Sequence, residues 1–365
     1  MRAGIAIVPL LVLAALSSAQ ASPGQYEGRI ELGGEYDTNP TRVEQVSGLP
    51  VTQPSLVARL VGMGSYATRL SDRFLLSLSA GVGGKRFSSP AVAGEDVLVA
   101  HSQDMLGLRL DPRSSLFLSV GYYEAFQRNQ RESRAFRSLA PMARWERYLG
   151  ESSHLVLGAG FRDFVFKSDG AFSFRAPTFL AQFRQGFPGD VLAGEADWEW
   201  SGQASLEVRR FAGPACSERL CEGHQSDQFA TGQFEVARVA GILLGAGVGM
   251  HLNRSNAFGQ SLTRGILHLR AVIPLPLSLS LSSRIEAVRT QYREKVTVLV
   301  PVSGNASASI EDESRSSLRV ELSRVFGEGL EIGARYAYYT SAASSGGMEF
   351  HRQTILLYLA AIAEP

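Results

Sequence analysis

The sequence predicts an all-β fold, a transmembrane antiparallel up-and-down β-barrel of about 16 strands, with about 18 as the alternative. Three observations predict it. Apolar and charged residues alternate along many segments, these segments are longer than the strands of soluble sheets, and short turns alternate with longer polar connections. Alternation indicates an extended strand, because successive side chains of a strand point to opposite faces of the sheet.

The N-terminus has the three-part pattern of a secretory signal peptide. Met1-Arg2 gives a positive start, a mostly apolar stretch runs from Ile5 to Leu16, and Ala19-Gln20-Ala21 supplies small residues before a cleavage site. We predict a signal peptide over residues 1–21, cleavage after Ala21, and a single barrel domain over residues 22–365. An N-terminal membrane anchor is the alternative, but the apolar stretch is short for a transmembrane helix.

Residues 26–37 are the clearest example of the strand pattern. Ile30, Leu32 and Tyr36 lie on one face, and Glu31 and Glu35 lie on the other. A helix would spread these charges around its whole circumference. The segment has about twice the usual length of a strand in a soluble sheet. The pattern recurs in order along the chain, at residues 116–122, 155–161, 197–209, 267–271, 279–286, 318–322 and 330–338.

A soluble secreted sandwich, propeller or β-helix is the alternative fold. A propeller would show a motif repeated about every 40–50 residues, and the sequence contains none. A sandwich would have shorter strands and irregular connections. The long alternating segments therefore favour the barrel.

Connections of two kinds alternate along the chain. Turn-forming clusters of Gly, Pro, Asp and Ser lie at residues 70–73, 111–114, 150–153, 188–190, 240–241, 274–277 and 326–329. Longer polar connections lie at residues 38–54, 88–96, 128–133, 168–171, 212–227, 254–261, 294–313 and 341–349. In outer-membrane barrels the short turns are periplasmic and the longer loops are extracellular. We therefore predict the bacterial outer membrane as the location, with both termini in the periplasm.

The longest connections leave two points open. Alternating valines from Val296 to Val302 could extend a hairpin or add a strand pair, which would give about 18 strands. Any plug of the lumen is expected to come from residues 38–54 or 294–313, because the first strand begins soon after the predicted cleavage site.

Composition and motifs exclude several classes of function. Lys and Arg number 36 against 35 Asp and Glu, so the chain lacks the basic excess of a nucleic-acid-binding protein. It contains no zinc-protease motif, CxxC pair or phosphate-binding loop, so we predict no cofactor and no enzymatic activity. His224-Gln225-Ser226 resembles the nucleophile region of outer-membrane lipases, but polar residues are expected in a long loop, which disfavours the enzyme alternative.

Two cysteines lie close together, Cys216 and Cys221. Outside the cytoplasm such a pair most often forms a disulfide, here one that would pin its loop. A metal site that also includes His224 is the alternative, but it lacks a fourth ligand. We predict the disulfide and no metal.

Charged residues on the polar faces of the strands are the predicted lining of the channel. Both signs are interleaved, so we predict a mixed-charge aqueous lumen rather than a strongly ion-selective one. The predicted lining residues are Arg29, Glu31, Glu35, Arg59, Arg109, Arg144, Glu146, Arg162, Asp197, Glu199, Glu207, Arg209, Arg270, Arg284, Glu286, Arg319, Glu321 and Arg335.

The first strand resembles the opening strand of outer-membrane barrels that export polysaccharides, including the poly-N-acetylglucosamine exporters. The residues that carry the resemblance are Gly33-Gly34-Glu35-Tyr36-Asp37-Thr38-Asn39-Pro40. A signal peptide followed by a barrel is similar to the layout of Wzp-type barrels. The chain lacks the tetratricopeptide domain of the poly-N-acetylglucosamine group, which leaves the substrate open.

The resemblance implies a channel that exports an exopolysaccharide or capsule-type glycan across the outer membrane. It also implies a monomer embedded in outer-membrane lipid, a periplasmic polysaccharide export protein as partner and a glycan chain as substrate. A general or solute-selective diffusion porin is the alternative. In that case selectivity would come from charged clusters at a constriction, and trimers are expected.

Overall fold

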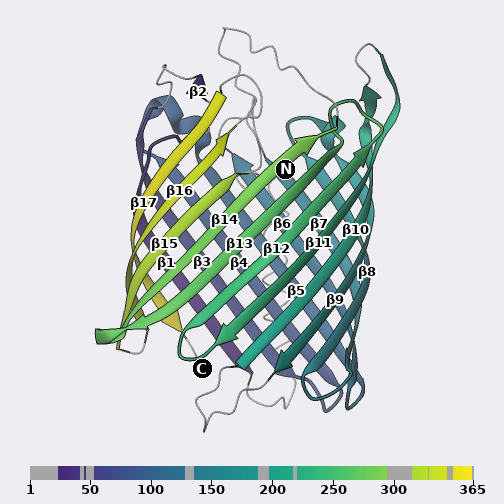
Figure 1. Cartoon of the computed structure of the whole chain (residues 1–365), viewed down its shortest axis with the longest axis vertical. Coiled ribbons are helices and arrows are strands. Elements are labelled where there is room, and N and C mark those ends of the chain that lie inside the picture. The colour runs from purple at the N-terminus through teal and green to yellow at the C-terminus, as the bar shows by residue number, and fades with distance from the viewer. Residues whose placement is uncertain are drawn as a thin grey trace.

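The chain forms one closed antiparallel β-barrel (Figure 1). The computed structural model describes residues 24–41, 45–46, 53–127, 135–187, 197–216, 220–293, 315–327, 329–342 and 348–363. Strands that follow one another in sequence pair around the wall, and β1 (Gln25–Asp37) pairs with both β3 (Ser55–Arg69) and β17 (Met348–Ala363). The sheet has 17 strands, but β2 (Gln45–Val46) spans only two residues, so 16 build the wall. This confirms the predicted barrel and its lower strand count.

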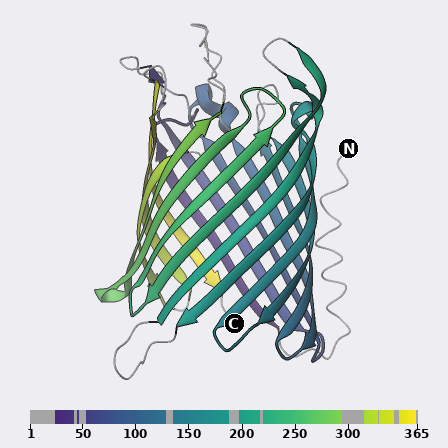
Figure 2. The same cartoon turned by 45° about the vertical axis from the view of Figure 1, so that its right-hand side comes forward.

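The other long strands have between 11 and 20 residues, enough to cross a bilayer at a tilt. Figure 2 shows this tilt against the barrel axis. They are β4 (Phe74–Phe87), β5 (Val97–Asp111), β6 (Ser114–Gln127), β7 (Phe136–Tyr148), β8 (Ser153–Phe166), β9 (Phe174–Phe187), β10 (Asp197–Cys216), β11 (Cys221–Val239), β12 (Leu243–Ser255), β13 (Leu262–Leu275), β14 (Leu279–Tyr292), β15 (Ser316–Phe326) and β16 (Leu330–Ala342). Short 3-10 helices are η1 (Pro90–Glu95), η2 (Gly170–Phe172) and η3 (Pro276–Ser278).

The two ends of the barrel differ. Short turns join β3 to β4, β5 to β6, β7 to β8, β11 to β12, β13 to β14 and β15 to β16, and this end is called the turn end. At the β11–β12 turn Gly241 has a φ of 71°, a conformation that favours glycine. The opposite, loop end carries the longer connections with η1 and η2. Strand β1 begins and β17 ends at the turn end.

Several predictions fall outside the described residues. These are the signal peptide over residues 1–21, the tight turn at 188–190, the alternating valines at 296–302 and the plug candidate at 294–313. Of the other plug candidate, 38–54, only residues 38–41, 45–46 and 53–54 are described.

One predicted loop is wrong. Residues 212–216 and 221–227 form the ends of β10 and β11, the longest described strands with 20 and 19 residues, and these strand ends rise beyond the loop end (Figure 2). Cross-strand pairing continues to the tip through Ala215 and Glu222, with register shifts next to Pro214. Cys216 and Cys221 form a disulfide that joins the two strand ends. The polar composition of this segment predicted a loop, but the pairing and the disulfide maintain the hairpin.

The wall has an apolar face and a polar face. Leu32 and Leu60 lie directly opposite each other, and their exposed fractions are 57% and 45%. On the other face of the same strand Glu31 and Glu35 are almost completely buried, with exposed fractions of 4% and 3%. Large exposed apolar side chains on the outside and buried charges on the inside are expected of a wall between lipid and a polar lumen. No helix in the described part of the chain is long and apolar enough to span a membrane.

Candidate functional site: the charged inner face of the barrel

The cross-strand register puts all eighteen predicted lining residues on the inner face. Directly opposed residues share a face, so the register follows around the wall from β1, for example from Gly33 to Arg59 and from Arg59 to Lys85. Their role in lining a conducting channel stays a prediction. The structure divides them into two groups of contacts and a set of more separate side chains.

The first group, called the seam cluster, lies where the two ends of the chain meet. It alternates basic and acidic side chains from β15, β16, β1, β3 and β4, and consists of Arg29, Glu31, Glu35, Arg59, Lys85, Glu321, Glu331 and Arg335. Arg29 bonds Glu331 across the intervening strand β17. Four positive and four negative side chains balance one another, so the cluster adds no net charge.

Short distances connect the seam cluster across the strands. Lys85 Nζ lies 2.7 Å from Glu35 Oε1, and Arg59 Nη1 lies 3.6 Å from Glu35 Oε2. Arg335 Nε lies 2.5 Å from Glu321 Oε2, and Arg335 Nη2 lies 3.7 Å from Glu31 Oε2. Buried carboxylates require such partners, because an unpaired charge is costly to remove from water. The cluster therefore fixes the inner face at the barrel closure.

Tyr358 connects two acids of the seam cluster. Its hydroxyl oxygen lies 2.7 Å from Glu321 Oε1 and 2.9 Å from Glu331 Oε1, so it can donate to either carboxylate. Gly333 makes room for the ring, since a Cβ there would lie 2.3 Å from Tyr358 Cζ. The glycine thus allows the aromatic ring to lie flat beside β16.

Replacing Tyr358 with phenylalanine is expected to lower the free energy of unfolding by about 1–3 kcal/mol. The change removes a donor from the buried carboxylate of Glu331 and the half-buried one of Glu321, and keeps the ring. Urea unfolding of the detergent-solubilised barrel, followed by tryptophan fluorescence, measures the effect. Tyr336→Phe on the outer face of β16 is the matched control and should change little. Equal losses in the two variants would contradict a specific role of the hydroxyl.

A second pair at the seam lies toward the loop end. Arg352 on β17 bonds Asp37 on β1 through Nη2–Oδ2 at 2.7 Å, Nε–Oδ1 at 3.1 Å and Nε–Oδ2 at 3.2 Å. Asp37 has an exposed fraction of 0% and Arg352 of 4%. The backbone N–H of Asn39 also donates to Asp37 Oδ1, at 3.0 Å. This buried, bidentate pair joins the first strand to the last.

The second group, called the arginine row, crosses β13, β14 and β15. Arg270 lies directly opposite Arg284, and Arg284 lies directly opposite Arg319. Arg270 Nη2 is 2.5 Å from Glu235 Oε1, and Arg284 Nη2 is 3.1 Å from Glu286 Oε2. Arg319 has no acidic partner among the residues that the structure describes. Three guanidinium groups thus face two carboxylates, and the Arg284 side chain is 60% exposed to the lumen.

Glycines on β12 leave space beside the arginine row. A Cβ at Gly245 would lie 2.7 Å from Arg270 Nε, and one at Gly247 would lie 2.4 Å from His268 Cε1. His268 in turn lies 3.4 Å from Glu235 Oε2. The Gly-x-Gly-x-Gly spacing of this strand therefore serves the packing of neighbouring inner side chains.

The remaining predicted residues are dispersed over β5 to β10. Arg162 Nη1 and Arg209 Nε each lie 2.9 Å from Glu207, and Arg184 Nε lies 3.3 Å from Glu199 Oε1. Arg144 contacts Met105 and the Phe117 ring instead of a carboxylate. Glu146 pairs with His154 at 3.4 Å. Arg109 and Asp197 share the inner register without joining either group.

A row of aromatic rings on the inner face was not predicted. From β6 to β10 the ring centroids of consecutive members are 5.3, 5.2, 4.9 and 5.2 Å apart. The members are Tyr123, Phe136, Phe164, Phe174 and Phe211. Arg209 lies over the Phe229 ring at 4.0 Å and next to Phe174 at 5.1 Å. On β7 to β10 these aromatic residues are in phase with inner charges of the same strand, such as Arg144, Arg162, Arg184 and Arg209, and this was the available signal.

The alternative metal site at the cysteines is not formed, because both sulfur atoms are used in the disulfide. Within the described ranges no three His, Cys, Asp or Glu side chains are arranged to hold a metal ion.

Comparisons with known proteins show the fold. No family model and no curated protein matches the chain. Among solved structures, the barrel is similar to OccK8 (OprE) of Pseudomonas aeruginosa, with a TM-score of 0.53, 9% identity, and coverage of 95% of this chain and 100% of that one. It is also similar to the outer membrane protein OprD of the same organism, with a TM-score of 0.52, 6% identity, and coverage of 95% and 96%. A third is the loop-deleted outer membrane protein OmpT of Vibrio cholerae, with a TM-score of 0.50, 11% identity, and coverage of 94% and 100%.

These similarities correct the predicted function. The barrel resembles porins of the OprD and Occ type over nearly its whole length, so the prediction of a polysaccharide-export channel is wrong and its porin alternative is favoured. The opening-strand motif misled because its residues close the barrel: Asp37 pairs with Arg352, and Asn39 Nδ2 donates to the His351 carbonyl at 3.2 Å. In fold the chain is a 16-strand barrel that resembles the OprD and Occ porins.

Proposed function

We propose that the protein is an outer-membrane porin for the diffusion of small polar solutes, with a preference for solutes that carry an anionic group. The exposed apolar outer face suits lipid, and the charged inner face suits a water-filled lumen. The resemblance to OccK8 and OprD supports the same function and an outer-membrane location. Turns on the periplasmic side and loops outside follow the usual orientation of such barrels.

The arginine row is the observation that carries the anionic preference. Like charges directly opposite one another are unfavourable, and an anion that passes between them offsets this repulsion. Arg270 and Arg284 are 46% and 60% exposed, so a solute can reach both. The seam cluster next to the row is balanced, which leaves the row as the principal source of local selectivity.

Planar-bilayer recording tests the proposal. Purified barrel added to one side of a bilayer is expected to produce stepwise conductance increases in potassium chloride. Under a salt gradient the reversal potential should indicate that chloride passes more easily than potassium. Heat-denatured protein is the control. Absence of steps from protein that is demonstrably folded would overturn the channel, and a cation preference would overturn the role of the arginine row.

A further inference from the structure

Basic side chains gather on the outer face of the barrel at the loop end. In each strand these residues alternate with the inner residues and therefore face outward. In the cross-strand register, for example, Arg137 lies opposite Glu124 and Arg254 lies opposite Gln228, both on the outer face. This group, called the basic collar, consists of Arg86, Arg137, Lys167, Arg175, Arg210, Arg254 and Arg289. Acidic side chains at this rim include Glu124, bonded to Lys167, Asp163, bonded to Arg175, and Asp96, which lines a hollow together with Arg86. The rim is therefore positive.

Arg175 and Arg210 are the centre of the collar. They lie directly opposite each other on β9 and β10. Arg175 Nε is 3.0 Å from Asp163 Oδ1, yet the Arg175 side chain is 77% exposed. Two guanidinium groups thus lie on neighbouring strands, and Asp163 bonds that of Arg175. A phosphate group would relieve the repulsion, because planar guanidinium groups bind phosphate oxygens in pairs.

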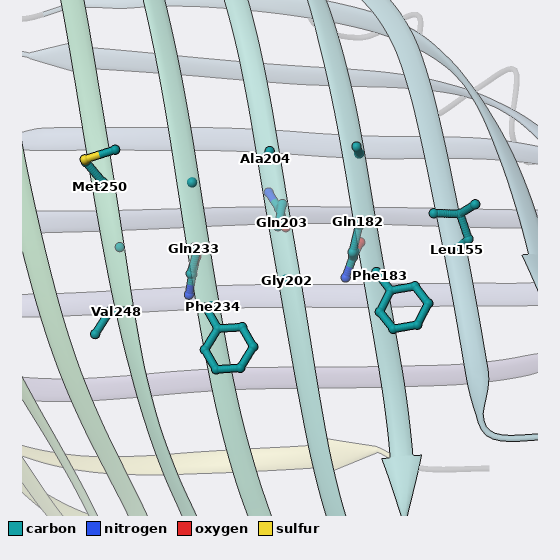
Figure 3. A pocket seen from close by; sticks show the side chains of 13 residues that line it. Leu155, Gln182, Phe183, Gly202, Gln203, Ala204, Gln233, Phe234, Val248 and Met250 are labelled. Carbon is teal, nitrogen blue, oxygen red and sulfur yellow. The ribbon is translucent and has the colours of Figure 1, made fainter.

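A hollow lies on the same outer wall, closer to the turn end (Figure 3). Its volume is about 560 Å³ and its floor is made of small residues, Ala181, Gly202, Ala204 and Gly232. Phe183 and Phe234 flank it, as Figure 3 shows, and its lining is apolar apart from backbone and glutamine atoms beneath the floor. A Cβ added at Gly202 or Gly232 would meet no atom within 4 Å. The missing side chains therefore create the hollow.

The distance between the two features fits one lipid. Six residues separate Arg210 from Ala204 along β10, or about 20 Å at the usual rise of a strand. With the usual barrel tilt this is about 15 Å along the membrane normal, and one leaflet of hydrocarbon is also about 15 Å thick. A headgroup at the Arg175–Arg210 pair would thus place the end of an acyl chain at the hollow.

We propose that the Arg175–Arg210 pair and the hollow bind one phosphorylated, acylated glycolipid of the outer leaflet, of the lipid A type. The phosphate lies between the two arginines, and an acyl chain fills the space above Gly202 and Gly232. The inference rests on the membrane placement in the proposed function and not on conduction.

Native mass spectrometry of the whole barrel in detergent tests the site, with lipid A as the probe. The wild-type protein is expected to retain lipid A, and to retain dephosphorylated lipid A at least about fivefold less because the charge-assisted hydrogen bonds are lost. Phosphatidylglycerol should also be retained less than lipid A, because its phosphodiester carries one negative charge and a phosphomonoester carries up to two. This comparison requires no variant. Equal retention of the three lipids would overturn the proposal.

Two variants locate the site. Arg175→Gln/Arg210→Gln should reduce lipid A retention to the level of the dephosphorylated lipid. Arg238→Gln is the matched control, because Arg238 is an outer-face arginine at the turn end, next to Trp198. Gly232→Leu should fill the hollow and weaken retention while both arginines stay in place. Unchanged binding in the arginine variant, or an equal loss in the control, would overturn the assignment.

Failure of the porin function is distinguishable from failure of this site. A folded barrel that retains lipid A but gives no conductance would contradict only the proposed channel. A barrel that conducts but does not distinguish the three lipids would contradict only the lipid site.

Discussion

Replacing Arg352 with methionine is expected to lower the free energy of unfolding by about 3–5 kcal/mol, the usual cost of leaving a buried charge without its partner. Asp37 is fully buried and receives three hydrogen bonds from the guanidinium group. Without Arg352 the carboxylate of Asp37 loses these donors at the point where β1 meets β17. Urea unfolding of the folded barrel in detergent measures the change.

Two further variants test the origin of this loss. Asp37→Asn/Arg352→Met removes both charges, and we expect it to recover most of the stability because no unpaired ion is then left inside. Arg254→Met changes an exposed arginine of the outer face and should have little effect. A double variant as unstable as the single one would show that packing, and not the charge pair, accounts for the result.

Replacing two arginines of the arginine row, Arg284→Gln/Arg319→Gln, is expected to convert the proposed anion preference into a cation preference. Only Arg270 would then face Glu235 and Glu286. Each unit charge at about 4 Å in water contributes about 1 kcal/mol, which corresponds to roughly a fivefold change in local ion concentration. The chloride-to-potassium permeability ratio should therefore fall at least about fivefold.

Ionic strength provides an internal check on this prediction. The difference between variant and wild type should be smaller in about 1 M salt than in about 0.1 M salt, because screening shortens from about 10 Å to about 3 Å. Arg254→Gln on the outer face is the control and should leave the ratio unchanged. A permeability ratio that does not respond to the loss of the two arginines would place the selectivity of the lumen elsewhere.

The faces of the strands could be predicted from sequence because alternation of period two is a local signal. It assigned Arg319 and Glu321 on β15 and Arg335 on β16 to the inner register without any knowledge of their partners. Glu331 was placed on the same polar face as Arg335 but not among the lining residues, and Lys85 and Tyr358, which share the inner register, were missed. The strands of Lys85 and Tyr358, β4 and β17, carry several glycines or alanines, so their alternation of apolar and charged residues is weaker.

The contacts across the closure could not be predicted in this way. Asp37 and Arg352 are 315 residues apart, and alternation along one strand does not contain the register between the first strand and the last. The motif from Gly33 to Asn39 illustrates the difficulty. A Cβ at Gly33 would lie 2.7 Å from Leu356 Cδ1, and Thr38 Oγ1 accepts from the Gln353 N–H at 2.9 Å. Much of the motif therefore serves the pairing of the first strand with the last, and it does not indicate which substrate passes through the barrel.

The position of this closure has a consequence for biogenesis. Strand β1 leaves its edge unpaired until β17, the last strand of the described chain, has been synthesised and delivered. An open sheet would expose two rows of backbone donors and acceptors, which promote aggregation in water and are not tolerated in lipid. A chain shortened before Met348 would leave one edge of β1 and one edge of β16 without a partner strand. Truncated translation products should thus be substrates for periplasmic chaperones and proteases and not partly functional pores.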